Sequence, residues 1–290
     1  MVIGSAFLVV TERKALGMLQ LRQGPNKASL KGFAQPVADG VKLLSKGASF
    51  TYFSQFLKSV AGPFVVFLLA CLFWLIVPVS FSARSFELGF LFFLCVSSLS
   101  VYGIFLCGWS CNSRYGLLGS LRGVAQTISY EALMSSLLFC PLLLMGSFDF
   151  SVFREWGISN FFLFFEVFVL WIFVVLAETN RAPFDFVEGE SEIVSGYSVE
   201  FGGGSFAMIA LGEYSNIFFM SVLTSLFFFW GSSFFWSDLV MSFFSVLMCY
   251  FVISVRGAFP RLRYDLLMEI CWKTLLPLSF SFLTFFSLFC

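Results

Sequence analysis

The sequence contains no histidine in its 290 residues. This absence excludes histidine-ligated haem and most zinc sites, because imidazole is a common ligand of both. The eight cysteines are scattered, and no two of them form a Cys-x-x-Cys pair. Free cysteines in apolar segments behave as small hydrophobic side chains. The chain is therefore expected to bind no redox metal of its own.

Charge is also scarce. Only 12% of the residues are charged, the 17 basic and 17 acidic side chains cancel, and 59% of the residues are hydrophobic. An ordinary soluble domain is about 45–50% apolar and about 25% charged. The balanced charge excludes a basic nucleic-acid-binding surface. The mean hydropathy of +0.92 predicts an all-α, multi-pass membrane protein with one transmembrane domain over residues 1–290.

Motifs for nucleotide binding and for nucleophilic catalysis are missing. The sequence has no Walker A loop, no Gly-x-Gly-x-x-Gly after a strand, and no Ser or Cys nucleophile with a His base. The run Gly202-Gly203-Gly204 has no following Lys and no preceding strand. We interpret it as a flexible approach to a helix, not as a phosphate-binding loop.

Apolar runs between charged or Gly/Pro-marked breaks predict about eight transmembrane helices. Their expected ranges are 1–23, 60–81, 86–109, 128–148, 161–178, 206–229, 238–255 and 274–290. The first range leaves two alternatives, because a charged cluster follows only eleven uncharged residues. Either the chain starts with a short half-span, or the helix continues through the cluster to Gln23.

Basic residues predict the orientation of these spans. Segments 12–58, 110–127, 179–205 and 256–273 contain fifteen of the seventeen Lys and Arg residues. The positive-inside rule places them on the cytosolic side or on its mitochondrial equivalent, the matrix. Inside loops are therefore expected at about 24–58, 110–127, 179–205 and 256–273, with both termini on the opposite side.

The first inside loop is expected to contain an amphipathic helix. Gly24-Pro25 ends the preceding helix, and Pro36 suits the first turn of a new one. Apolar residues from Val37 to Leu44 then share one face, with Asp39 and lysines opposite. This pattern is typical of a helix on the membrane surface, and equally of one packed on other protein.

Among the acidic residues in or at the ends of predicted spans, the informative ones are Glu131, Glu178 and Glu213. A charge at mid-membrane costs about 2.5–3.5 kcal/mol on insertion scales, so such residues face the bundle interior or water and indicate function. The alternative is a structural ion pair, for example with Arg122 or Arg181.

The third inside loop concentrates further acid, including Glu188, Glu190 and Glu192. Clustered carboxylates raise one another's pKa, which would let them exchange protons near neutral pH. A solvated acidic loop is the alternative, although it does not explain Glu131 and Glu213. Together these residues predict a polar, carboxylate-lined path through part of the bundle.

Four long sequence motifs lie in or beside the inside loops. They are ERKALG (12–17) with QLRQGPN (20–26), GSLR (119–122) with AQTISYE (125–131), LAETNRAPFD (176–185) with EGESE (188–192), and PRLRYD (260–265). In this order, and over nearly the whole chain, they resemble the signatures of membrane subunit 1 of NADH:quinone oxidoreductase, respiratory complex I.

The resemblance implies eight transmembrane helices and a tunnel that admits ubiquinone or a related quinone, with its entrance near the first helix, the surface helix and the sixth helix. It also implies a mitochondrial inner-membrane location. The implied partners are neighbouring membrane-arm subunits, membrane lipids and a hydrophilic arm whose iron–sulfur clusters deliver the electrons. The implied proton-path residues are Glu12, Asp39, Glu131, Glu178, Glu188, Glu190, Glu192 and Glu213, and the implied tunnel and partner cations are Arg13, Arg22, Arg122, Arg181, Arg261 and Arg263.

Two other functions remain open from the sequence. The homologous membrane subunit of an energy-converting hydrogenase would share the fold and use a different electron partner. A stand-alone proton-coupled transporter would suit the acidic loop, although the sequence shows no inverted repeat. The first span is shorter than this resemblance implies, and Glu166 matches no functional position of the family.

Overall fold

The computed structural model describes residues 1–47, 54–78, 86–153, 159–187, 189, 196–229 and 237–288. Helices make up the regular structure of this described part, and no strand occurs in it. The all-α fold class is therefore confirmed. The longer helices are α1 (Val2–Leu19), α2 (Gln35–Ser45), α3 (Phe56–Phe73), α4 (Gly89–Ser110), α5 (Arg114–Met145), α8 (Phe165–Glu178), α10 (Gly204–Phe228), α11 (Ser237–Ala258) and α13 (Leu276–Ser287).

Short elements complete the description. They are α7 (Ser159–Leu163), α12 (Tyr264–Glu269), a π-helical segment η4 (Ile270–Leu275), and the 3-10 turns η1 (Leu30–Gly32), η2 (Phe150–Val152) and η3 (Gly196–Ser198). Each of the eight predicted spans overlaps at least one helix, with different bounds in several places. Six helices among the described residues are long and apolar enough to cross a membrane: α3, α4, α5, α10, α11 and the rod from α12 to α13.

The first and the fifth expected spans each differ from a simple apolar helix. Helix α1 continues through Glu12, Arg13 and Lys14 and ends at Leu19, so the second of the two sequence alternatives holds, four residues short of Gln23. The fifth span is made of two pieces, because α7 ends at Leu163 and α8 begins at Phe165.

The predicted inside loop at 110–127 is wrong for most of its length. Helix α5 begins at Arg114, and the Ser113 Oγ accepts a hydrogen bond from the Gly116 N–H at 3.3 Å to cap it. Its 32 residues give a length of about 48 Å, against about 30 Å of bilayer hydrocarbon. The helix therefore extends beyond the hydrocarbon and carries residues expected in a loop.

The predicted loop at 256–273 is also largely helical. Helix α11 continues to Ala258, and α12, η4 and α13 form one rod from Tyr264 to Ser287. The π-helical segment precedes Pro277, which has no N–H to donate to the carbonyl four residues earlier. A local π turn accommodates such a missing bond without ending the helix.

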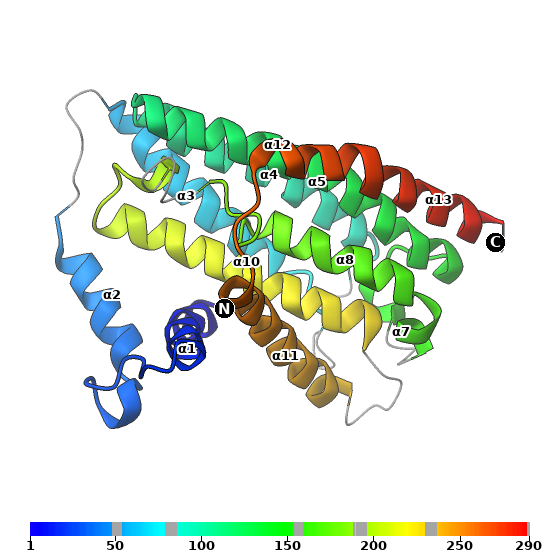
Figure 1. Ribbon diagram of the computed structural model, residues 1–290, viewed down its shortest axis with the longest axis horizontal. Coiled ribbons are helices and arrows are strands. Elements are labelled where there is room, and N and C mark those ends of the chain that lie inside the picture. The colour runs from blue at the N-terminus through cyan, green and yellow to red at the C-terminus, as the bar shows by residue number, and fades with distance from the viewer. Residues whose placement is uncertain are drawn as a thin grey trace.

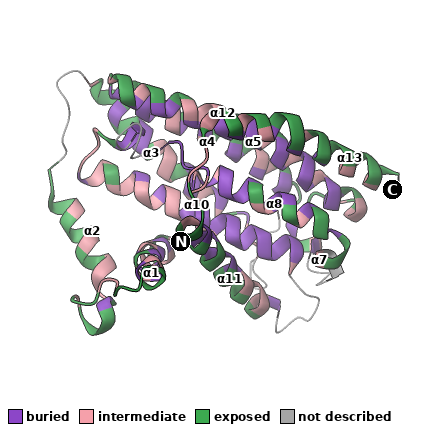
Figure 2. Cartoon of the chain, viewed as in Figure 1, coloured by how far each residue is buried: buried purple, intermediate pink, exposed green. Residues whose placement is uncertain are grey.

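Helix α10 organises the bundle. It packs against α1, α3 and α11, while α5 packs against α4, α8 and α13 (Figure 1). Helix α2 stands apart from the main bundle and contacts α1 and α10 (Figure 1). None of its residues is buried (Figure 2), and its exposed face carries Val37, Val41 and Leu44. The predicted amphipathic helix is confirmed.

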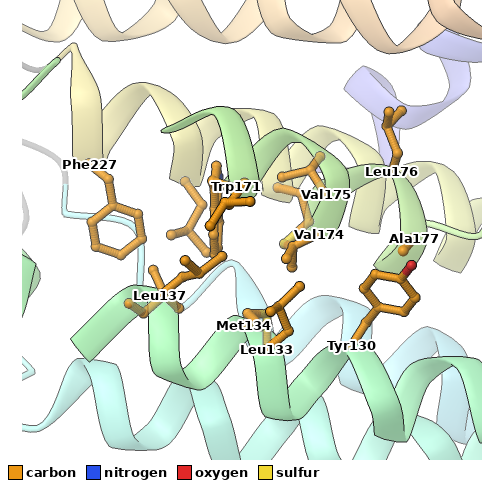
Figure 3. Close-up of a cluster of buried hydrophobic side chains, with 14 of the residues drawn as sticks. Tyr130, Leu133, Met134, Leu137, Trp171, Val174, Val175, Leu176, Ala177 and Phe227 are labelled. Atoms are coloured by element: carbon orange, nitrogen blue, oxygen red, sulfur yellow. The ribbon is translucent and has the colours of Figure 1, made fainter. Parts of the chain in front are cut away.

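Large apolar side chains fill the space between α5, α8 and α10. Figure 3 shows Trp171 and Val174 of α8 facing Leu133 and Leu137 of α5. The Trp171 ring meets Phe227 of α10 edge-on, with centroids 6.0 Å apart. Because lipid tails are as apolar as these side chains, such close packing contributes through dispersion contacts more than through the hydrophobic effect. This core fixes the inner end of α8, where Glu178 lies.

A glycine sets the approach of α3 to α4. A Cβ at Gly62 would lie 2.8 Å from the Cys107 Sγ and 3.0 Å from its backbone nitrogen. Small residues allow this kind of close helix contact in membranes. The two helices together form one wall of the site described below.

Gly62→Val is expected to destabilise the fold by about 1–3 kcal/mol, because the added carbons force α3 and α4 apart. Gly40→Val is the matched control, since a Cβ at Gly40 meets nothing within 4 Å. Thermal denaturation of the detergent-solubilised protein measures both. Equal melting temperatures for the two variants would contradict the close-contact explanation.

Candidate functional site

A buried cluster of charges lies where α1, α10 and α11 meet the third inside loop. Glu12 is 5% exposed, and its Oε1 accepts hydrogen bonds from Arg181 at 3.4 Å and from Arg256. Arg181 is itself buried, and its guanidinium lies 4.5 Å from the centre of the Tyr214 ring. One carboxylate thus pairs with two cations from distant parts of the chain.

The helical repeat of α1 turns Glu12 inward. Leu8, Glu12 and Ala15 are all buried and recur at intervals of four and three residues, so they share one face. Arg13 lies on another face and is exposed. It pairs with Asp39 of α2 at 2.9 Å. Glu12 and Arg13 are neighbours in the sequence, yet they make contacts in two different places.

A turn after α8 places Arg181. Asn180 adopts a left-handed backbone conformation with φ of 50°, which is uncommon except in Asn, Asp and Gly. Further along, Asp185 is buried and pairs with Arg261 at 3.3 Å. The Leu262 N–H donates to the Pro183 carbonyl at 3.1 Å. The segments that follow α8 and α11 are thus joined by a side-chain pair and a backbone bond.

A cavity lies beside this cluster, between α3, α4, α10 and the inner end of α8. It leaves about 50 Å³ for the centres of water-sized molecules, enough for a few waters. Polar and apolar side chains line it: Val66, Leu69, Phe73, Phe93, Ser97, Ser100, Ile104, Thr127, Glu178, Thr179, Asn180, Tyr197, Glu213, Asn216, Phe219 and Met220.

The three acidic residues singled out from the sequence, Glu131, Glu178 and Glu213, gather at this cavity. Glu178 and Glu213 line it, and Glu131 accepts a hydrogen bond at 3.3 Å from Ser97, which also lines it. The buried Tyr197 hydroxyl donates to Glu213. The Glu178 Oε2 is buried with no hydrogen-bond partner among the described residues. A carboxylate oxygen so placed requires water or a proton.

Electrostatic interactions connect the cavity to the charge cluster. Glu213 interacts with Arg181, Arg256 and Asp185, and Glu178 interacts with Glu131. The charge state of Glu213 is therefore linked to the charge cluster, and that of Glu178 is linked to Glu131.

Other predicted residues lie elsewhere. Asp39 and Arg13 pair at the protein surface, Arg22 is exposed, and Arg263 pairs with Asp265 in an exposed contact. Arg122 lies over the Tyr264 ring, 6.0 Å from its centre. The positions of Glu188, Glu190 and Glu192 lie outside the described residues, so their predicted role stays a prediction.

Several residues of this site were missed by the sequence reasoning. Arg256 was counted as an inside-loop charge but not as a site residue, and its position in the last turn of α11 was the available signal. Tyr197, Tyr214 and Asn216 carry no charge, so hydropathy gave no reason to select them. No group of three or more His, Cys, Asp or Glu side chains among the described residues could hold a metal ion.

Comparison with known proteins identifies the family. The family model described as NADH dehydrogenase matches residues 1–287. The chain belongs to this NADH dehydrogenase family. It is similar to "NADH-ubiquinone oxidoreductase chain 1" of Aedes aegypti, with 44% identity over 98% of this chain and 90% of the relative. The proteins of the same name from Locusta migratoria (45% identity; 98% and 90%) and Pecten maximus (42%; 95% and 81%) are also similar.

Substitution of Glu12 tests whether the buried charge cluster stabilises the fold. Glu12→Gln leaves Arg181 and Arg256 without their shared carboxylate, and breaking a buried pair typically costs about 3–5 kcal/mol. Asp265→Asn removes the carboxylate of an exposed pair, which contributes at most about 1 kcal/mol. The melting temperature of each detergent-solubilised variant should show a large loss for the first and almost none for the second. Similar losses would show that the buried cluster is not a stabilising contact.

Proposed function

We propose that this chain is the core membrane subunit of a proton-pumping NADH:ubiquinone oxidoreductase. In this proposal it forms much of the quinone access tunnel and supplies a carboxylate-lined path that couples quinone reduction to proton translocation. The supporting observation is that Glu131, Glu178 and Glu213 gather at one cavity beside the buried Glu12–Arg181–Arg256 cluster.

The comparisons support membership of a larger assembly. The relatives reported above carry the name of one chain of NADH-ubiquinone oxidoreductase. We propose that other subunits complete the enzyme and that iron–sulfur clusters in its hydrophilic arm deliver the electrons. The names favour this function over a hydrogenase subunit or a stand-alone transporter. We place the chain in the mitochondrial inner membrane with its charged loops facing the matrix.

The tunnel would run between the three elements that the resemblance implied. Helices α1, α2 and α10 contact one another, and α2 exposes an apolar face. An isoprenoid tail requires such apolar walls. The quinone head group carries two carbonyl oxygens, which accept hydrogen bonds from guanidinium groups. Arg181 and Arg256, which contact Glu12 of α1, would supply such donors.

Reduction of the quinone would change the charge that the carboxylates sense. Two electrons added to a quinone require two protons to form the quinol, so negative charge builds up until protons arrive. Glu213, held by Tyr197, interacts with the Arg181 and Arg256 cations. A negative charge near these cations would alter the balance of charge around the Glu213 carboxylate, and in this proposal Glu178 and Glu131 at the same cavity respond as well.

The polar lining of the cavity ends at an aromatic group. Phe73, Phe93 and Phe219 line it together, and their ring centroids lie 4.9–5.8 Å apart. In the proposed orientation, these rings line the outer end of the cavity, and the serines and carboxylates line its inner end. Protons would therefore enter from the inner side and would leave this chain sideways or through a neighbouring subunit, since hydrocarbon side chains conduct no protons.

Glu178→Gln is expected to weaken energy coupling more than assembly, because the amide cannot exchange a proton. Protons translocated per NADH oxidised should fall in assembled complex reconstituted in sealed vesicles. Glu166→Gln is the matched control, since Glu166 lies at the other end of α8 and does not line the cavity. An unchanged proton yield in the Glu178 variant would contradict the coupling path. We expect Glu192→Gln to behave like Glu178→Gln.

A photoreactive ubiquinone analogue is expected to label this chain in the intact complex, since the chain lines the tunnel. Labelled peptides identified by mass spectrometry should come from α1, α2, α10 or the third inside loop, and excess ubiquinone should prevent the labelling. Labelling confined to other subunits would count against the tunnel. Migration of the chain as a small species without NADH-oxidising activity on a native gel would count against the whole assignment.

A further inference from the structure

Gln126 connects the two ends of the turn that carries the site. It lies on α5 with its side chain 0% exposed. Its Nε2 donates to the Ala177 carbonyl and to the Phe184 carbonyl, each at 2.9 Å. Ala177 lies in the last turn of α8, and Phe184 lies seven residues later. One amide group thus holds both ends of residues 177–184.

The orientation of this amide follows from its partners. Two carbonyl oxygens face it, and a carbonyl can only accept hydrogen bonds. The NH2 group must therefore point toward them, because the amide oxygen in its place would bring three acceptors together. Both N–H bonds of Gln126 are used, and its Oε1 is buried without a described partner. The position requires a side chain with two donors on one atom.

The held turn presents four residues of the site. Glu178 and Asn180 line the cavity, and Arg181 pairs with Glu12. Inside the turn, the Phe184 N–H donates to the Arg181 carbonyl at 2.8 Å. Asp185, directly after Phe184, pairs with Arg261. Movement of either end of the turn would shift a carboxylate and a cation together.

Tyr130, one helical turn further along α5, supports the same turn by packing. Its ring lies 6.2 Å from the Phe184 ring, and Figure 3 shows it beside Ala177. Tyr130 packs against the turn, whereas Gln126 supplies two side-chain hydrogen bonds from α5 to it. The Ala177 carbonyl also accepts from the Asn180 N–H at 3.2 Å, and the Phe184 carbonyl accepts from the Phe186 N–H at 3.1 Å. These backbone bonds lie within the chain segment itself, so the loss of Gln126 would remove the hydrogen bonds that tie both ends of the turn to α5.

We propose that Gln126 is a positioning residue that sets the relative placement of Glu178, Arg181 and Asp185. It acts through the backbone of the turn and touches none of the reacting groups. The inference rests on the proposed function, since the turn matters for activity only if the cavity and the charge cluster do.

Two substitutions separate the hydrogen bonds from side-chain volume. Gln126→Met keeps a similar length without donors, and Gln126→Glu keeps the shape but turns acceptors toward the two carbonyls. Ser120→Ala is the control: Ser120 is equally buried on α5, and its hydroxyl bonds only to the Leu117 carbonyl of its own helix. Each variant is studied as intact complex in sealed vesicles.

The readouts are the protons translocated per NADH oxidised, the turnover and the ubiquinone KM, all measured per assembled complex. Reduced stability alone lowers the amount of complex and leaves these quantities unchanged. Both Gln126 variants should lower the proton yield, and the turnover should fall about ten-fold or more, since a displacement of about 1 Å at a reacting group can cost about a hundred-fold in rate. Ser120→Ala should leave all three readouts unchanged.

Assembled Gln126→Met complex with normal proton yield, turnover and KM would overturn the proposal. So would failure of both Gln126 variants to assemble beside normal assembly of Ser120→Ala, because Gln126 would then be needed for folding alone. Glu178→Gln, measured in parallel, distinguishes failure of the proposed coupling path from failure of the positioning role alone. A normal proton yield there refutes the proposed coupling path, whereas a loss there with normal Gln126→Met refutes only the positioning role.

Discussion

Hydrocarbon cannot solvate an ion, and every charge that this chain carries into the bilayer must find its partner inside the protein. Glu12 meets this constraint by sharing Arg181 and Arg256. These three residues come from α1, the turn after α8 and the end of α11. The cluster therefore joins the first helix to the rest of the bundle by buried ion pairs. Other helices of the bundle pack mainly through apolar side chains. The position of α1 depends on that contact.

The same constraint explains why the carboxylates of the spans lie together. A single carboxylate inside a membrane needs water, a proton or a cation, and one hydrated cavity can serve several of them. Glu178 and Glu213 share the cavity, and Glu131 reaches it through Ser97. One cavity thus solves the solvation problem of several carboxylates at once. The proposed coupling of quinone reduction to proton translocation starts from this arrangement.

The polar groups are held in place by packing and by backbone hydrogen bonds. Trp171 and its neighbours fix α8, Gln126 holds the turn that follows, and the Leu262 N–H ties the fourth inside loop to Pro183. Each of these contacts leaves a charged side chain in a defined place. Precise placement matters because electrostatic effects between buried groups change steeply with distance.

The sequence by itself determined the membrane fold and the family. Runs of apolar residues predicted helices in all eight places, since burial of an apolar segment in lipid requires its backbone to bond internally. The long motifs predicted the family that the comparisons confirmed. Helix ends were less predictable: the charges and glycines of residues 114–127 wrongly indicated a loop, although this segment forms the first turns of α5. Only the tertiary structure decided which charges pair. Glu12 and Arg256 lie 244 residues apart, and Tyr197 and Gln126 carry no charge that hydropathy could detect. Their roles arise from the close approach of distant helices, a property of packing that no local pattern encodes.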